Sequence, residues 1–187
     1  MAPLLKRARV CGLSQNSSLA APVRELVAAA DGAKRPFTAS ELALVCATCG
    51  SSKRFVQELM DQADALVDAA RACLLRHEPQ LVRPGGQLYP AHRAVACWRD
   101  CAQFLRVIVY AVACGCPAVS DGEGVQALLA LYALMDVPLP ALRFALASLR
   151  QQALAAMAGA GCPADLHNLD QAFADLLKAL QHPVKSC

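Results

Sequence analysis

Apolar residues recur at helical spacing along almost the whole chain, and this periodicity constrains the fold more than any other feature. No run of alternating apolar and polar residues between turn signals is long enough to predict a sheet. The sequence therefore predicts an all-α protein. The expected helices are 21–30, 39–48, 53–76, 92–114, 122–135, 139–158 and 163–180.

One long break interrupts this helical pattern. Residues 79–90 carry Arg-Pro-Gly-Gly at their centre, so we expect a non-helical loop between two long helices. Shorter breaks have ordinary capping chemistry, since Thr38 is followed three residues later by Glu41. Loops as long as 79–90 with turn chemistry of their own often carry function.

Composition bounds the class of protein. A chain of 187 residues with 56% hydrophobic residues can form one domain with a substantial core. A net charge of +3 and only 5% aromatic residues argue against nucleic-acid binding. The most apolar stretch, 104–116, is shorter than the roughly 18 residues that a bilayer span needs, so we expect no membrane insertion.

The first 20 residues differ from the rest. They are basic, contain a short Ser/Asn run and precede the first acidic residue, Glu25. This pattern is compatible with an organelle transit segment and equally with a disordered extension. We therefore expect a basic extension over 1–20 and one helical domain over 21–187.

The segment AHRAVACWRDCAQFLRVIVY is the richest in reactive side chains. Helical spacing aligns a guanidinium, a thiol, a carboxylate and an aromatic ring on one face, namely Arg93, Cys97, Asp100 and Phe104. Arg99 lies off this stripe, but its long side chain can reach the same ligand. Periodicity alone is explained better by core thiols and a solvated charge cluster than by a ligand site.

Metal and catalytic sites are poorly supported. None of the ten cysteines has paired zinc-ligand spacing in a fitting order, and we expect most of them to be small buried hydrophobes. His92 lies five positions before Cys97, which places the two apart around a helix axis. We predict no metal site, no catalytic residue and no enzymatic activity.

The segment RPGGQLYPAHRAVACWRD resembles the loop-and-helix signature of phycobiliproteins, in which a proline-glycine-glycine loop leads into an alanine-cysteine-x-arginine-aspartate helix. The likeness covers about residues 21–181. Further coincident positions are Leu105-Arg106, Tyr110, Gly115, Asp121, Tyr132 and Val137-Pro138. This resemblance implies a globin-like fold with an N-terminal helical hairpin. Among the subfamilies, the arginine-proline-glycine-glycine loop is most like that of allophycocyanin-type and other β-like subunits.

This resemblance implies one covalently bound open-chain tetrapyrrole, phycocyanobilin or a related bilin. Cys97 would form the thioether, and Asp100 would accept hydrogen bonds from the central pyrrole N–H groups. Arg99 and Arg93 would pair with the propionates. The implied function is absorption of light and transfer of excitation energy in a phycobilisome-type antenna.

Several positions around the implied site depart from the family pattern. Gln87 stands where the family has asparagine, and an aromatic pair has become Gln103-Phe104. The stretch over the pigment reads Asp-Gly-Glu-Gly at 121–124. Cys162 lies near the position of a second bilin in some relatives, but the insertion that carries that bilin is missing, so a plain thiol is expected. The chain therefore resembles a divergent member of this family. We expect it to bind the pigment through Cys97, with Gln87 and Phe104 beside the pigment.

The resemblance also implies partners and a location. Asp31 and Arg106 match two positions that pair between different chains in the family, although ordinary surface charge explains them equally well. The expected partners are a complementary subunit, in an α/β heterodimer and larger rings, and linker polypeptides. The expected location is the cyanobacterial cytoplasm or the plastid stroma, at the thylakoid surface.

Two alternatives remain at this point. The first is a pigment-free subunit or assembly factor with the same fold, which the altered positions favour. The second is a globin-fold sensor that binds haem or another tetrapyrrole without a thioether, with His92 as its axial ligand.

Overall fold

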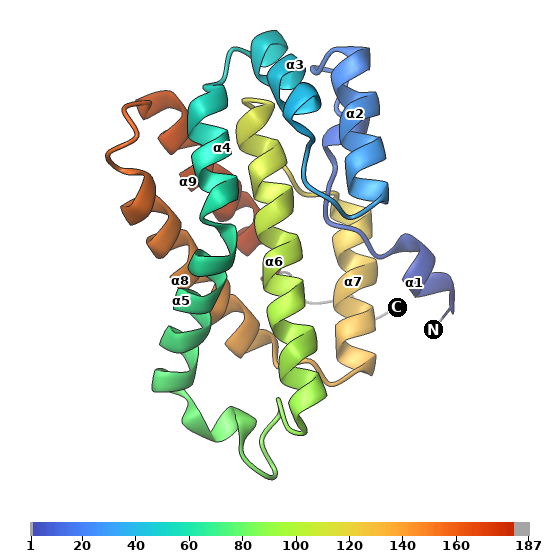
Figure 1. The fold of residues 1–187 in the computed structure, drawn as a ribbon. Helices are drawn as coiled ribbons and strands as arrows, with labels where there is room; N and C mark the ends of the chain where they lie inside the picture. Colours follow the sequence, from blue (N-terminus) through green and yellow to red (C-terminus); the bar gives the residue numbers. More distant parts are fainter. Residues whose placement is uncertain (1, 182–187) are drawn as a thin grey trace.

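The computed structural model describes residues 2–181, and its helices pack around α6 at the centre of the molecule (Figure 1). Met1 and residues 182–187, the end of the predicted domain, lie outside the described residues. The helices are α1 (Ala2–Arg7), η1 (Leu13–Gln15), α2 (Ala21–Gly32), α3 (Ala39–Cys49), α4 (Lys53–Asp61), α5 (Ala63–His77), η2 (Pro79–Val82), α6 (Ala91–Ala113), α7 (Gly122–Leu134), α8 (Leu139–Met157) and α9 (Pro163–Ala179). The all-α prediction is confirmed, since the β pairing within residues 2–181 is a single isolated bridge between Cys11 and Ser120.

Helix α6 changes character along its length. From Val107 to Ala113 every residue is at most 3% exposed. Helix α6 as a whole packs on α4, α5 and α9. A helix that is apolar on all sides is expected to be buried in this way. The first half is more open, and Val95 is 65% exposed. The half with the predicted site therefore faces outward while the other half anchors the helix.

Two predicted boundaries were wrong. The expected helix 53–76 is two helices, α4 and α5, which meet at Gln62 without a proline or glycine to mark the break. The expected loop 79–90 begins with the 3-10 helix η2. Its remaining residues turn sharply, and a Cβ atom at Gly86 would overlap the backbone of Gln80 and Leu81. Glycine is thus required where this loop closes on itself.

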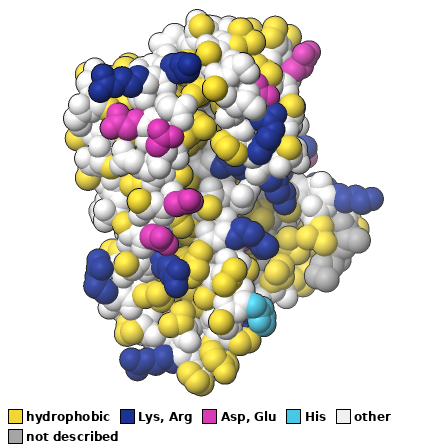
Figure 2. Space-filling view, viewed as in Figure 1, with side chains coloured by type: hydrophobic (Ala, Val, Ile, Leu, Met, Phe, Trp, Pro, Cys, Tyr) yellow, Lys and Arg dark blue, Asp and Glu magenta, His cyan; other side chains and the backbone are white. Residues whose placement is uncertain are grey.

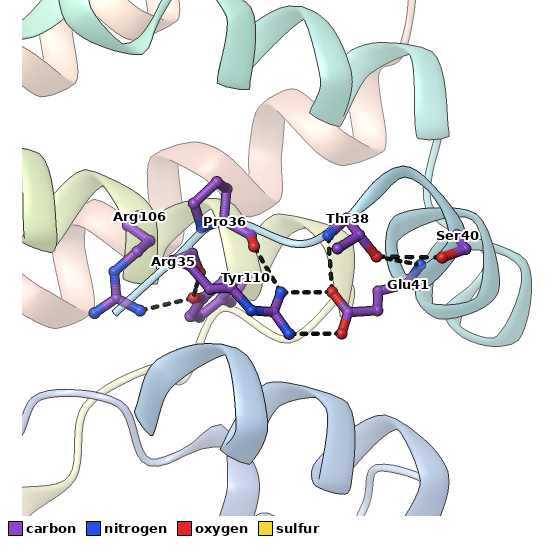
Figure 3. Close-up of polar contacts among 7 residues, drawn as sticks. All are labelled: Arg35, Pro36, Thr38, Ser40, Glu41, Arg106 and Tyr110. Carbon is purple, nitrogen blue, oxygen red and sulfur yellow. Dashed lines mark hydrogen bonds and ion pairs between the residues drawn. The ribbon is translucent and has the colours of Figure 1, made fainter. Parts of the chain in front are cut away.

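Helices α2 and α3 form the predicted hairpin, and α3 begins as its sequence predicts. The Thr38 hydroxyl accepts a hydrogen bond from the Glu41 amide, and the Glu41 carboxylate accepts one from the Thr38 amide. Both terminal nitrogens of Arg35 donate hydrogen bonds to the same carboxylate, at 2.7 and 2.8 Å (Figure 3). The turn between the two helices is therefore held by its own side chains.

A second set of contacts joins this hairpin to α6. The Arg106 guanidinium donates to Asp31 at 2.9 Å and to the Tyr110 hydroxyl at 2.7 Å. The Tyr110 hydroxyl in turn donates to the Arg35 carbonyl (Figure 3). The Tyr110 ring lies 4.7 Å from the ring of Phe37. Asp31 and Arg106 thus pair within one chain, and their contact with a second chain stays a prediction.

The basic extension is folded in the structure rather than disordered. After α1, the Asp121 amide donates to the Val10 carbonyl and the Gly12 amide donates to the Val119 carbonyl, both at 2.8 Å. Leu13 is fully buried beside α2. Residues 8–13, which we call the N-terminal strap, therefore lie against the start of α7. A role as a transit segment stays a prediction.

Candidate functional site

The predicted site residues lie where α6 passes α7. Over the described residues α6 packs closely on α4, α5 and α9 but not on α7, and a cavity of about 90 Å³ opens between α6 and α7. Its lining includes Cys97, Arg99 and Asp100 from α6 together with Tyr132, Met135 and Val137 from α7 and the turn after it. The structure thus brings the cysteine, arginine and aspartate of the motif to one cavity.

Cys97 lies at this cavity with its side chain 7% exposed. Cys101 follows one turn later on the same helix, with its thiol beside that of Cys97. This contact lowers the pKa of Cys97, against the effects of burial and of Asp100, which raise it. A thiolate is the nucleophilic form of cysteine, so Cys97 is the better placed of the two thiols for covalent chemistry.

Asp100 lies one turn along from Cys97 and has unused hydrogen-bonding capacity. One carboxylate oxygen accepts a hydrogen bond from the Tyr132 hydroxyl at 2.8 Å. No described residue forms an ion pair with it, and burial raises the pKa of Asp100 above its usual range. A partly buried carboxylate with vacant lone pairs is stabilised by a ligand that brings N–H donors.

The two predicted propionate ligands differ. Arg93 donates to the carbonyls of Gln87, Met135 and Asp136, at 2.8, 3.3 and 2.7 Å. It therefore ties the loop before α6 to the end of α7. Arg99 lines the cavity and is exposed, and its guanidinium forms no hydrogen bond or ion pair within residues 2–181. Of the two guanidinium groups, Arg99 is the one that is open to an anionic ligand.

The remaining predicted residues lie further from Cys97. Gln87 is exposed and contributes its backbone carbonyl to Arg93. Phe104 is buried and lines a neighbouring cavity of about 200 Å³, which shares Asp100 and Tyr132 with the first. His92 is exposed and lines neither cavity, so the haem alternative lacks the ligand that it requires.

The described part of the chain lacks two kinds of feature, namely groups of metal-ligating side chains and membrane-spanning helices. Within residues 2–181 no three His, Cys, Asp or Glu side chains are grouped so that they can hold a metal ion. The helices described there are also too short or too polar to cross a bilayer. The Cys162 thiol donates to Asp165 at 2.7 Å beside the start of α9, far along the chain from α6.

Sequence reasoning missed Tyr132 as a member of the site. Its hydroxyl reaches Asp100 from another helix, which no pattern within one segment reveals. The signal was its place among the coincident family positions. The surface of the molecule gives no comparable indication of where the site lies. Hydrophobic side chains gather over the lower part of the face drawn in Figure 2, with Lys and Arg among them.

Comparison with known proteins shows which family this chain resembles. The model of the family described as phycobilisome protein matches residues 25–180. Over 83 residues the chain is 35% identical to the C-phycocyanin beta chain of Aglaothamnion neglectum, which covers 44% of this chain and 48% of that one. It is also 32% identical over 116 residues to a C-phycocyanin beta subunit of Synechocystis, covering 60% of this chain and 67% of that one.

A further relative is of the allophycocyanin type. The allophycocyanin alpha-B chain of a Synechococcus strain is 31% identical over 107 residues, covering 57% of this chain and 66% of that one. The chain thus spans about half to two thirds of the length of these curated relatives.

One solved structure has the same fold. It is a far-red fluorescent biliprotein derived from an allophycocyanin F subunit of Chroococcidiopsis thermalis, with a TM-score of 0.61 and 23% identity. The match covers 71% of this chain and 95% of that one. The predicted globin-like helical fold is confirmed by this likeness.

Proposed function

Because the chain belongs to the phycobilisome protein family, we propose that it is a light-harvesting subunit that carries one open-chain bilin on Cys97. The observation that carries this proposal is the grouping of Cys97, Arg99 and Asp100 at one cavity between α6 and α7. Its action is absorption and resonance transfer of excitation energy, and no residue acts as a catalyst on a turned-over substrate.

Cys97 is the attachment residue in this proposal. Its thiol adds across the A-ring ethylidene double bond, so that sulfur bonds one carbon and the proton goes to the other. Electrons balance without an oxidant. The lowered pKa of Cys97 beside Cys101 raises the share of thiolate that performs this addition. A pigment supplies the visible absorption that the side chains lack.

Asp100 holds the central rings. Its raised pKa and single hydrogen bond from Tyr132 indicate a carboxylate that gains from N–H donors. Pyrrole N–H groups are such donors, and a carboxylate beside them favours the protonated, coloured form. Tyr132 keeps the carboxylate oriented from the opposite side of the cavity.

Arg99 is the propionate ligand that the geometry favours, since it lines the cavity and bonds no other described residue. A guanidinium matches the two oxygens of a carboxylate. Arg93 acts instead through the loop, because its three bonds to backbone carbonyls fix the chain on either side of the cavity. Gln87 and Phe104 complete the surroundings from the loop and from the neighbouring cavity.

The partners follow from the family. Relatives of this chain include beta chains of phycocyanins and an alpha-B chain of an allophycocyanin. We propose a complementary subunit of the same fold, larger rings and linker polypeptides, at the thylakoid surface of a cyanobacterium or a plastid. Asp31 and Arg106 can serve that contact only if their bond within the chain is shared or exchanged.

Coexpression with a bilin supply and a bilin lyase tests the function. The chain should give a zinc-enhanced fluorescent band on a denaturing gel and a red-absorbing native protein. A colourless band would overturn the proposal and favour the pigment-free structural subunit. Acid-acetone extraction is the control, because a pigment held without a thioether leaves the protein in that solvent.

A further inference from the structure

The cavity beside Cys97 is small for a four-ring pigment. Its volume of about 90 Å³ lies well below the roughly 300 Å³ at which small-molecule sites begin. The neighbouring cavity adds about 200 Å³ and shares Asp100 and Tyr132 with it. Only the two together approach the size of a pigment site, so the neighbouring cavity is the place to seek its second half.

This second cavity continues in the direction of α6. Asp100, Phe104 and Val107 line it on successive turns after Cys97. At a rise of about 1.5 Å per residue, Cys97 and Val107 are about 15 Å apart along the helix. An extended four-ring chain that starts at Cys97 and passes Asp100 therefore enters this cavity.

The N-terminal strap forms part of the wall of this cavity. Ala8, Arg9 and Val10 line it together with the residues of α6. The strap is held there by backbone bonds, from the Arg9 amide to the Gly124 carbonyl at 3.3 Å and from the Asp121 amide to the Val10 carbonyl at 2.8 Å. An ion pair joins Arg9 to Asp121 as well.

The lining of this cavity carries three cations, Arg9, Lys34 and Arg106, against two carboxylates, Asp31 and Asp100. Lys34 lines it from the hairpin and forms no ion pair with any described residue. The other cations, Arg9 and Arg106, are already paired with Asp121 and Asp31. An ammonium group without a partner at the mouth of a cavity can bind a propionate.

We propose that the N-terminal strap forms the outer wall of the pigment site, enclosing the half of the bilin furthest from Cys97, with Lys34 as a propionate ligand there. This inference rests on the proposed function and extends it to residues 8–10, which precede the part of the chain that the family model matches. The chain thus supplies from its own N-terminus a wall that restricts the pigment's motion.

Two glycines of α7 offer a matched test. A Cβ atom at Gly124 would overlap the Arg9 side chain and lie 2.6 Å from the Arg9 carbonyl oxygen, so Gly124→Ala must push the strap outward. A Cβ atom at Gly122 meets nothing within 4 Å. Gly122→Ala adds the same methyl group to the same turn and is the control.

The first readout uses pigment-free protein. Amide hydrogen exchange at Arg9 and Gly12, and alkylation of buried Cys11, report how firmly the strap is seated. Gly124→Ala should speed both at least tenfold, and Gly122→Ala should leave both unchanged. Attachment of the bilin to the wild type should slow the same exchange severalfold, because a ligand stabilises the state that encloses it.

The second readout uses loaded protein. Gly124→Ala should keep the pigment on Cys97 but lose severalfold in fluorescence, while Gly122→Ala should match the wild type. Val10→Asp, which adds a charge to the cavity without a clash against α7, should shift the absorption band even if Gly124→Ala folds poorly.

Two results would overturn the inference alone: strap exchange that does not change when the pigment attaches, or wild-type spectra in both Gly124→Ala and Val10→Asp. Absence of pigment from wild-type Cys97 is a different result, because it would overturn the proposed function and this inference together.

Discussion

Glu41 in the hairpin and Asp100 beside Cys97 are both partly buried carboxylates, but their surroundings differ. The Arg35 guanidinium and the Thr38 amide hold Glu41, and they lower its pKa to about 2. Asp100 has one hydrogen bond, from Tyr132, and burial raises its pKa. The hairpin satisfies its polar groups within the chain, whereas the cavity between α6 and α7 leaves a carboxylate that a ligand can satisfy.

Removing the Cys97 thiol should break the site completely and spare the hairpin. Cys97→Ala should reduce covalent pigment below detection, while helical content stays near that of the wild type, because one small side chain contributes little to this core. Zinc-enhanced gel fluorescence and circular dichroism measure the two effects. Cys162→Ala is the control and should stay coloured, because the Cys162 thiol is hydrogen-bonded to Asp165 and does not line the cavity. If Cys97→Ala kept its colour and Cys162→Ala lost it, the pigment would be attached to Cys162 and not to Cys97.

Changing Asp100 should have the next largest effect. Asp100→Ala should keep the thioether but weaken and blue-shift the absorption band, because the pyrrole N–H groups lose their charged acceptor. Asp100→Asn preserves the shape and loses only the charge, so it separates packing from electrostatics. Absorption spectra of the pigment-loaded variants measure both effects. Identical spectra for Ala, Asn and wild type would mean that Asp100 does not face the pigment.

Tyr110→Phe should break the hairpin contact and leave the site intact. Removing the hydroxyl leaves the Arg35 carbonyl without its donor. It also removes one acceptor of the Arg106 guanidinium, which keeps its bonds to Asp31 and Gln103. We expect a loss of about 1–3 kcal/mol in the free energy of unfolding, measured by urea denaturation of pigment-free protein. The yield of pigment on Cys97 should not change. A loss of pigment without a loss of stability would show that the hairpin and the site are not independent.

The two carboxylates should give opposite pH dependences of stability, the smallest of these effects. The lowered pKa of Glu41 stabilises the fold above its ordinary pKa of 4.5, and this advantage over Glu41→Gln should vanish as the pH falls toward 2. The raised pKa of Asp100 means that the folded state binds more protons, so its ionisation removes stability as the pH rises above 3.8.

Urea unfolding of pigment-free protein between pH 2 and pH 7 measures both dependences. Asp100→Asn should therefore be at least as stable as the wild type at neutral pH. A destabilised Asp100→Asn would show that the carboxylate is already satisfied by the chain, which would remove the contrast between the two regions.

Much of the fold could be predicted because helical periodicity, capping boxes and the glycine-rich loop are local signals. Thr38 and Glu41 marked the start of α3 from four residues of sequence. The break at Gln62 carries no proline or glycine and had no such signal. The strap was missed because its order depends on burying Leu13 and Cys11 against distant residues.

The site could be predicted in part for the same reason. Cys97, Arg99 and Asp100 share one helix, so their spacing placed them together. Tyr132 and the strap reach the two cavities from other parts of the chain, and one-dimensional spacing does not encode such approaches. For Asp31 and Arg106 the sequence left a contact between two chains and ordinary surface charge equally open. It did not reveal their bond within one chain, because sequence gives the pair but not the way in which the hairpin folds back.

The mass of one tryptic peptide tests the central claim most directly. Trypsin cuts after Arg93 and Arg99, so residues 94–99 carry Cys97 alone and residues 100–106 carry Cys101. In protein purified after coexpression with a bilin supply and a lyase, peptide 94–99 should be heavier by one bilin and peptide 100–106 should be unmodified. An unmodified peptide 94–99, or a bilin on another peptide, would contradict the assignment of Cys97 as the pigment's attachment site.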